Sequence, residues 1–194
     1  YKIFNYIPPY YNFLNMRKES RQLINIDANS FSKTIIYYVG AIDDFRKGFH
    51  FLISALNLLP KEIKSRIALQ ILGSKEKNIK ILNNLNIDYF CLGIFNDEVS
   101  QIIAYNAADI LICPSLLDNS PNVIAEAQMC GLPVFVRDGT GATEMICNGI
   151  SGTIFSRNRV DDLKDKILDF VLGKYNFNSF EISTRAKKTY SLEN

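Results

Sequence analysis

Residues 109–131 read DILICPSLLDNSPNVIAEAQMCG, and this order predicts a buried strand, a polar loop and a helix. The apolar run at 109–113 is the strand. Ser120 can cap the helix, Pro121 suits its first position and Gly131 suits its end. A strand that leads through a tight loop into a helix N-terminus is where open α/β sheets bind anions and nucleotides.

Two carboxylates accompany this turn. Asp118 lies in the loop and Glu126 in the second turn of the helix, roughly 8 Å along the axis from the helix start. Helical side chains lean toward the N-terminus, so both acids could flank one ligand at the rim of the sheet. Taken singly, Asp118 could be a helix-start acid that interacts favourably with the helix dipole, and Glu126 could be a surface residue, with no ligand for either.

The same stretch resembles the donor-site motif of glycosyltransferase family 4, a group of retaining sugar transferases with the GT-B fold. That family carries two acids separated by seven residues, with the second acid opening the pattern EAxxCGxPV, which residues 126–134 fit. Asp118 stands where the commonest form has Glu. The turn DNSPN resembles family members that act in capsule and lipopolysaccharide synthesis.

Apolar runs and helical spacing alternate along the rest of the chain. Six alternations favour an α/β fold, a Rossmann-like doubly wound parallel sheet of about six strands, over an all-α or all-β arrangement. The predicted strands are 35–41, 67–72, 89–92, 109–113, 133–136 and 153–155, and the predicted helices are 47–59, 75–85, 97–107, 121–130, 143–148 and 160–172.

The resemblance extends over nearly the whole chain, as the C-terminal half of a two-domain enzyme. Residues 1–34 are interpreted as an interdomain linker or lead-in segment, and residues 35–194 as a nucleotide-sugar-binding, Rossmann-like domain. The tail 185–192 resembles the penultimate helix of that fold. The N-terminal Rossmann domain of such an enzyme would be missing.

A basic turn, Arg46-Lys47-Gly48, follows the first predicted strand and opens its helix. Arg offers a planar donor fork, Lys a mobile point charge and the helix start free N–H groups, which together suit a diphosphate. Alone, the turn could equally be a solvated basic helix start. In the resembling family it binds the donor diphosphate, so Arg46 and Lys47 are expected to stabilise the leaving group.

The resemblance also implies roles for the other site residues. Asp118 is expected to contact hydroxyls of the transferred sugar as the third catalytic residue, and Glu126 to bind the ribose hydroxyls. Many family members carry Arg directly after the first strand glycine, but Ala41 stands there in this chain. The remaining donor-binding candidates are Gly40, Gly73, Gly93, Ile94, Asn119, Ser120, Pro121, Asn122 and Val123.

Composition narrows the function classes. A hydrophobic content of 47% and a charged content of 22% are typical of a globular protein, and a net charge of +2 disfavours a nucleic-acid partner. The four cysteines lack metal-ligand spacing, which favours free thiols in a reducing cytosol. No metal site is expected, because the chain has no DxD sequence. No run approaches the roughly 18 apolar residues of a membrane span.

The resemblance implies a retaining glycosyltransferase that moves a sugar from a nucleotide donor, expected to be a UDP-sugar, to a glycan or lipid-linked acceptor. Neither a cofactor nor a metal is expected. The full-length protein would be cytoplasmic, at the inner face of the membrane, and its missing domain would bind the acceptor. The 194-residue chain is expected to bind nucleotide weakly and to turn over little.

Three alternative functions compete with this prediction. A GT-B-fold nucleotide-sugar epimerase would need further acids and histidines near the sugar, and His50 is the sole histidine of the chain. A non-enzymatic Rossmann module that binds nucleotide cannot be separated from an enzyme by fold alone. A dinucleotide oxidoreductase is disfavoured because no GxGxxG follows the first strand.

Overall fold

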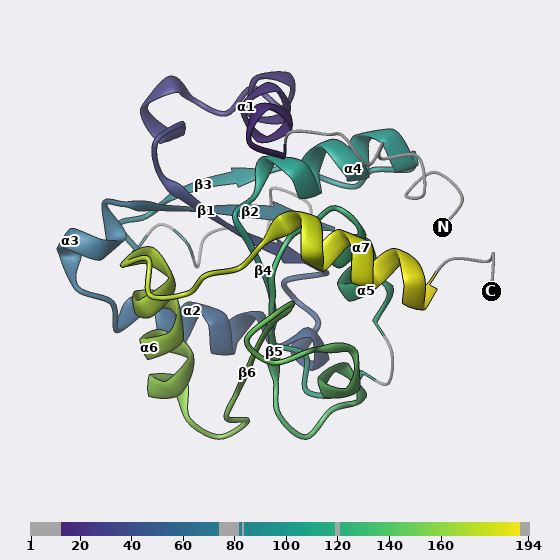
Figure 1. Cartoon of the computed structure of the whole chain (residues 1–194). Helices are drawn as coiled ribbons and strands as arrows, with labels where there is room; N and C mark the ends of the chain where they lie inside the picture. Colours follow the sequence, from purple (N-terminus) through teal and green to yellow (C-terminus); the bar gives the residue numbers. More distant parts are fainter. Residues whose placement is uncertain (1–12, 74–81, 83, 119–120, 191–194) are drawn as a thin grey trace.

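Six parallel strands form one sheet in the order β3-β2-β1-β4-β5-β6 (Figure 1). The fold was obtained as a computed structural model that describes residues 13–73, 82, 84–118 and 121–190. It confirms the predicted α/β class. The strands are β1 (Thr34–Val39), β2 (Ile67–Leu72), β3 (Asp88–Cys91), β4 (Ile110–Cys113), β5 (Val134–Arg137) and β6 (Gly152–Phe155).

The strands are apolar because helices cover both faces of the sheet. In β1 the side chains of Ile35 and Tyr37 pack into one core and those of Ile36 and Tyr38 into the other, and all four are buried. Successive side chains of a strand point to opposite faces, so a strand covered on both faces must be apolar throughout. This explains why uninterrupted apolar runs predicted the strands well.

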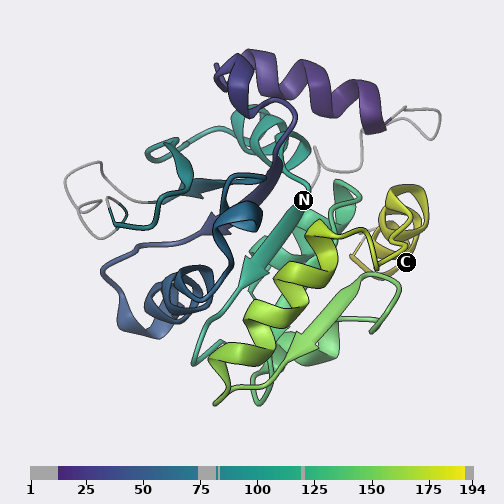
Figure 2. The same cartoon turned by 90° about the vertical axis from the view of Figure 1, so that its left-hand side faces the viewer.

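One face of the sheet carries α2 (Phe49–Asn57), α3 (Lys61–Lys64) and α6 (Val160–Val171). Figure 2 shows α2 and α6 side by side in front of the sheet. The other face carries α1 (Phe13–Leu23), α4 (Glu98–Ala107), α5 (Asn122–Met129) and α7 (Ser179–Tyr190). Short 3-10 segments are η2 (Ala28–Ser30), η3 (Phe45–Lys47) and η5 (Gly141–Met145).

The chain reverses its direction across the sheet between β1 and β4. After β1 it enters α2 on one face, and after β4 it enters α5 on the opposite face. In folds of this kind, ligands bind in the crevice beside such a switch point, at the carboxyl ends of the strands. The ladder is short here: β1 pairs six residues with β2 but only Ile36 and Tyr37 with β4.

Asp109 joins β1 and β4 at their amino ends. Its Oδ2 accepts a hydrogen bond of 2.7 Å from the Ile35 N–H and one of 2.6 Å from Arg21 Nη2. Arg21 belongs to α1, which packs against α4 (Figure 1). The described part of the predicted linker therefore packs against the sheet domain, while the division into domains stays a prediction.

Several predicted boundaries differ from the structure. Asp97 caps α4 by accepting a hydrogen bond from the Ser100 N–H, so the helix begins at Glu98, one residue after its predicted start. Pro121 occupies the N-cap of α5, so it precedes the first helical position that was predicted for it. The helix predicted at 143–148 is the 3-10 segment η5. The helix predicted at 75–85 lies largely outside the described residues.

The predicted end of α5 is confirmed. Gly131 has a positive φ of 71° and donates to the Gln128 carbonyl, while Leu132 donates to the Ala127 carbonyl. These two bonds form a Schellman motif, which needs a left-handed residue and so favours glycine. All four cysteines are free, and no helix of the described residues is long and apolar enough to cross a membrane.

Candidate functional site

The basic turn after β1 is held by a glycine. Gly48 has a φ of 69°, and a Cβ placed on it would lie 2.0 Å from the Pro114 carbonyl oxygen. The predicted helix start at Lys47 is therefore wrong, because the chain turns left-handed at Gly48 and α2 begins at Phe49. Only glycine tolerates both this backbone conformation and such a close approach.

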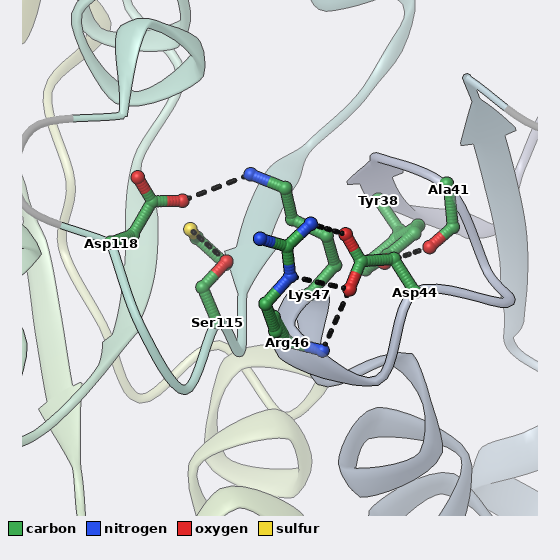
Figure 3. A network of polar contacts seen from close by, with 8 residues as sticks. Tyr38, Ala41, Asp44, Arg46, Lys47, Ser115 and Asp118 are labelled. Atoms are coloured by element: carbon green, nitrogen blue, oxygen red, sulfur yellow. Dashed lines mark hydrogen bonds and ion pairs between the residues drawn. The ribbon is translucent and has the colours of Figure 1, made fainter.

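This close approach brings the two loops of the crevice together. The Leu116 N–H donates a hydrogen bond of 2.7 Å to the Arg46 carbonyl. Lys47 then extends toward Asp118, and its Nζ lies 3.1 Å from Oδ2 of that carboxylate (Figure 3). The lysine side chain is 39% exposed and that of Asp118 18% exposed, so the ion pair is partly buried.

Arg46 is directed differently. It donates from Nε to Oδ1 of Asp44 at 3.0 Å and from Nη2 to Oδ2 at 2.8 Å, as Figure 3 shows. These bonds hold the pKa of Asp44 below its usual value. Because 71% of the Arg46 side chain is exposed, a ligand could reach it from solvent. Its contact with a diphosphate stays a prediction.

Glu126 is held by a tyrosine from the neighbouring helix. The Tyr105 hydroxyl donates a hydrogen bond of 2.7 Å to Oε2 of Glu126. Tyr105 is buried and packs edge-on against the Tyr37 ring at 5.2 Å between ring centroids. Burial raises the pKa of Glu126, and the hydrogen bond from Tyr105 opposes that rise. The other oxygen, Oε1, has no protein donor among the described residues and can accept from a ligand.

Three predicted glycines lie in a row at the carboxyl edge of the sheet. The Gly40 N–H donates to the Leu72 carbonyl, and the Gly73 N–H donates to the Gly93 carbonyl at 2.7 Å. A Cβ on Gly73 would lie 3.1 Å from the Gly40 carbonyl carbon. Because these three glycines carry no side chains, they contribute only backbone atoms to this edge of the sheet beside Lys47. Ile94, the other candidate here, is 58% exposed.

The candidates around the start of α5 are only partly placed. Asn119 and Ser120 lie outside the described residues. Pro121 is buried as the N-cap, and Asn122 and Val123 are the first helical residues. A helix start offers free N–H groups and a partial positive charge, which suits an anion.

Two partners of the site were missed from the sequence. Tyr105 lies 21 residues before Glu126, and nothing in its surrounding sequence relates the two. The role of Asp44 could have been found from the sequence. An acid two residues before a basic turn can accept a hydrogen bond from the backbone of that turn, as Asp44 does from the Arg46 N–H. The turn after β5 also joins the site, through the Gly141 N–H to the Asp118 carbonyl at 3.1 Å.

Comparison with known proteins identifies the family of the chain. A family described as Glycosyl transferases group 1 matches residues 20–188. The chain belongs to this family. The match includes the basic turn, the glycine row and both acids of the crevice.

The curated relatives include a protein of capsule synthesis. The capsular polysaccharide biosynthesis glycosyltransferase CapM of Staphylococcus aureus is 29% identical over 139 residues, which cover 69% of this chain and 35% of CapM. An uncharacterized glycosyltransferase of Methanocaldococcus jannaschii is 29% identical over 153 residues, 74% of this chain and 42% of that protein. The chain thus matches less than half the length of these relatives.

Solved structures of glycosyltransferases share the fold. HepE from Anabaena, in complex with UDP-glucose, has a TM-score of 0.72 over 90% of this chain and 48% of its own, at 19% identity. The lipopolysaccharide outer core galactosyltransferase WaaB has a TM-score of 0.71 over 82% of this chain and 46% of its own, also at 19% identity. At this identity the likeness shows the fold of the chain.

Proposed function

We propose that this chain is the donor-binding half of a retaining glycosyltransferase, the C-terminal half in a family 4 enzyme, and that it holds a nucleotide diphosphate sugar. The observation that carries the proposal is the pair of Lys47 and Asp118 across the switch point of the sheet. A partly exposed cation and a carboxylate 3.1 Å apart offer one group for phosphate and one for sugar hydroxyls.

The leaving group defines the chemistry required. When the bond from the sugar to the diphosphate breaks, negative charge develops on the phosphate oxygens. Lys47, Arg46 and the N–H groups at the start of α5 would stabilise that charge from fixed positions, which lowers the barrier. Asp118 orients the sugar through its hydroxyls. Glu126, fixed by Tyr105, binds the ribose.

The donor we propose is a UDP-sugar, and the acceptor a glycan or lipid-linked glycan in surface polysaccharide synthesis. UDP-glucose bound to HepE supports the donor, and CapM, a capsule-synthesis relative, supports the acceptor class. The acceptor would be bound by a preceding domain, because the chain matches 35% of the length of CapM. Such an enzyme would work on the cytoplasmic side of a membrane.

Calorimetric titration of the chain with UDP, GDP and ADP, with and without magnesium, tests the donor site. We expect one nucleotide to bind independently of magnesium, and Lys47→Ala and Glu126→Ala to abolish that binding. Lys174→Ala and Glu62→Ala are matched controls, because both residues are exposed and belong to other parts of the surface. Binding that survives in both site variants would contradict the proposed location.

A direct assay separates binding from turnover. The chain alone is expected to transfer little or no sugar from a UDP-sugar to an acceptor, because the acceptor-binding domain would be absent. Vigorous transfer by the 194-residue chain would show that the described domain suffices. If no nucleotide binds, the chain has lost the donor or needs its partner domain, and the same titration with a longer protein decides between the two.

A further inference from the structure

A second cavity lies at the opposite edge of the sheet, where the strands begin. It has a volume of about 380 Å³ and is lined by Arg17 and Arg21 of α1, by residues that lead into β1, and by Ser179 at the start of α7. Asp109 at the start of β4 forms part of its wall. The donor crevice is at the carboxyl ends of the strands, so the two sites are separated by the length of the sheet.

Positive charge exceeds negative charge around this cavity. Arg17 Nη1 lies 3.2 Å from Oδ1 of Asp109, and Arg21 Nη2 lies 2.6 Å from Oδ2 of the same carboxylate. Lys33, a third lining cation, pairs with Asp88. Three cations therefore face two carboxylates, and one acid is shared by two arginines.

The two arginines differ in how fully they are bonded. Arg21 is satisfied, since it also donates from Nε to the Ala107 carbonyl and from Nη1 to the Phe31 carbonyl. Arg17 has only its contact with Asp109 among the described residues, and its Nε is buried without an acceptor. Its side chain is still 24% exposed, and the residue lines the cavity. Burial lowers the pKa of Arg17, which marks a charge that its surroundings only partly compensate.

Helix α7 adds to the positive potential. Its twelve residues begin at Ser179, which lines the cavity, so the positive end of the helix dipole is directed there. The side chain of Asn178 accepts from the Glu181 N–H, and the Glu181 side chain is exposed. Arg17 and this helix start both line the cavity, and both favour an anion over a cation.

The rest of the wall is aromatic. Phe170, Tyr175 and Phe177 line the cavity and are each partly exposed. The rings of Tyr175 and Phe177 stack with centroids 5.1 Å apart, and both pack against the buried Phe135. A ligand here would meet cations on one side and ring surfaces on the other.

We propose that this cavity binds a small molecule in which an oxyanion group, phosphate or carboxylate, is joined to a ring or another apolar body. The oxyanion lies between Arg17 and the start of α7, and the ring lies against Tyr175 and Phe177. Nothing in this site depends on the donor crevice, so it is a second binding site of the domain.

Calorimetry of the whole chain with phenyl phosphate, inorganic phosphate and benzoate tests the proposal. Phenyl phosphate is expected to bind saturably and more tightly than inorganic phosphate, because the aromatic wall adds contacts. Comparison with benzoate then assigns the oxyanion, since tighter binding of phenyl phosphate indicates a phosphate ligand and tighter binding of benzoate a carboxylate. Absence of saturable binding by all three would overturn the proposal.

Two variants locate the binding. Ser179→Asp places a carboxylate at the start of α7, which the helix tolerates well but which repels an anion, and it should weaken binding by about tenfold or more. Arg17→Gln should do the same, with Lys18→Gln on the same helix as the matched control because Lys18 is exposed. If Arg17→Gln does not fold, Ser179→Asp still decides. Unchanged binding of the probe in Ser179→Asp would overturn the proposal. Displacement of the probe by UDP that disappears in Lys47→Ala would also overturn it, because the probe would then be bound in the donor crevice.

Discussion

Tyr105 and Glu126 join α4 to α5 through one hydrogen bond of 2.7 Å, from a buried hydroxyl to a half-buried carboxylate. The hydroxyl fixes one oxygen of the acid and leaves the other for a ligand. It also opposes the rise in the pKa of Glu126 that burial causes. The position and the charge of this acid therefore depend on a residue that a donor need not touch.

Tyr105→Phe should change the pH dependence of both stability and binding. Loss of the hydroxyl raises the pKa of Glu126 further above its ordinary value of 4.5. The folded protein then holds a proton over a range of pH where the unfolded chain has released it, so the free energy of unfolding falls as pH rises through that range. This pH range should be wider in the variant than in the wild-type chain. On acidification, nucleotide affinity should also begin to fall at a higher pH in the variant.

Urea unfolding and UDP titration from about pH 4 to pH 7 measure these effects. Glu126→Gln is the reference, because it cannot titrate and so removes the part of each profile that belongs to Glu126. At neutral pH the loss of this hydrogen bond should cost about 1–2 kcal/mol. Identical pH profiles for the wild-type chain and Tyr105→Phe would contradict the role given to Tyr105.

Asp118→Asn should have opposite effects on the binding of the nucleotide and on the binding of the sugar. The substitution releases Lys47 from its ion pair, so a diphosphate no longer competes with a carboxylate for the lysine. We expect the affinity for UDP to rise about two- to fivefold, in line with the strength of a partly exposed pair. The additional affinity for UDP-glucose over UDP should disappear, because the sugar loses an acceptor.

Calorimetry with both ligands checks this, with Asp138→Asn as the control because Asp138 is exposed on the same edge of the sheet. A fall in UDP affinity in Asp118→Asn would mean that Asp118 helps to bind the nucleotide itself.

Gly48→Ala should damage both the fold and the site. Its Cβ would lie 2.0 Å from the Pro114 carbonyl oxygen, so the two loops must separate. Gly173→Ala is the matched control, because Gly173 has a similar φ of 72° and nothing within 4 Å of the added Cβ. Left-handed backbone alone costs about 1–2 kcal/mol, which is the loss expected in the control.

A larger loss in Gly48→Ala, measured by urea unfolding, then reports the clash with Pro114. Nucleotide affinity should fall in the Gly48 variant only, since the turn that carries Lys47 moves. Equal destabilisation in the two variants would show that the loops adjust without strain.

Asp109→Ala should be among the most destabilising substitutions at the amino edge of the sheet. The carboxylate binds two arginines and the Ile35 N–H, and its loss leaves Arg21 largely buried with a charge that lacks its partner. Removing one member of such a buried pair typically costs about 3 kcal/mol or more.

Asp88→Ala provides the comparison, because its ion pair with Lys33 is half exposed and should contribute about 1 kcal/mol or less. Chemical unfolding of both variants measures the difference. A loss of similar size in the two would mean that Asp109 is no more than a surface acid.

The strands β1, β2, β4 and β5 were predictable because their side chains are mostly buried on both faces of the sheet. A run such as residues 67–72, IALQIL, cannot remain in water and is too short for a typical helix, and it forms β2 with the predicted bounds. The end of α5 was equally accessible, because Gly131 serves a local need of its own helix. Such features are decided by residues close together in the sequence.

The start of α2 and the partner of Glu126 were not predictable in this way. Gly48 reads as a weak helix former within a helical pattern, but its conformation is imposed by the Pro114 carbonyl, 66 residues further along the chain. Tyr105 reads as one more buried aromatic residue of α4. Its function as a donor appears only when α4 and α5 lie side by side. Contacts between distant segments determined both.

Because the ladder between β1 and β4 is short, a donor bound in the crevice would help to hold the two halves of the sheet together. Two paired residues, the Asp109 contacts at one end and the Lys47–Asp118 pair at the other hold the two halves of the sheet together. A donor bound to Lys47 and Asp118 would bridge this seam. Ligand affinity and the cohesion of the sheet are then linked in one equilibrium, so nucleotide binding would make the protein stiffer where its backbone pairing is thinnest.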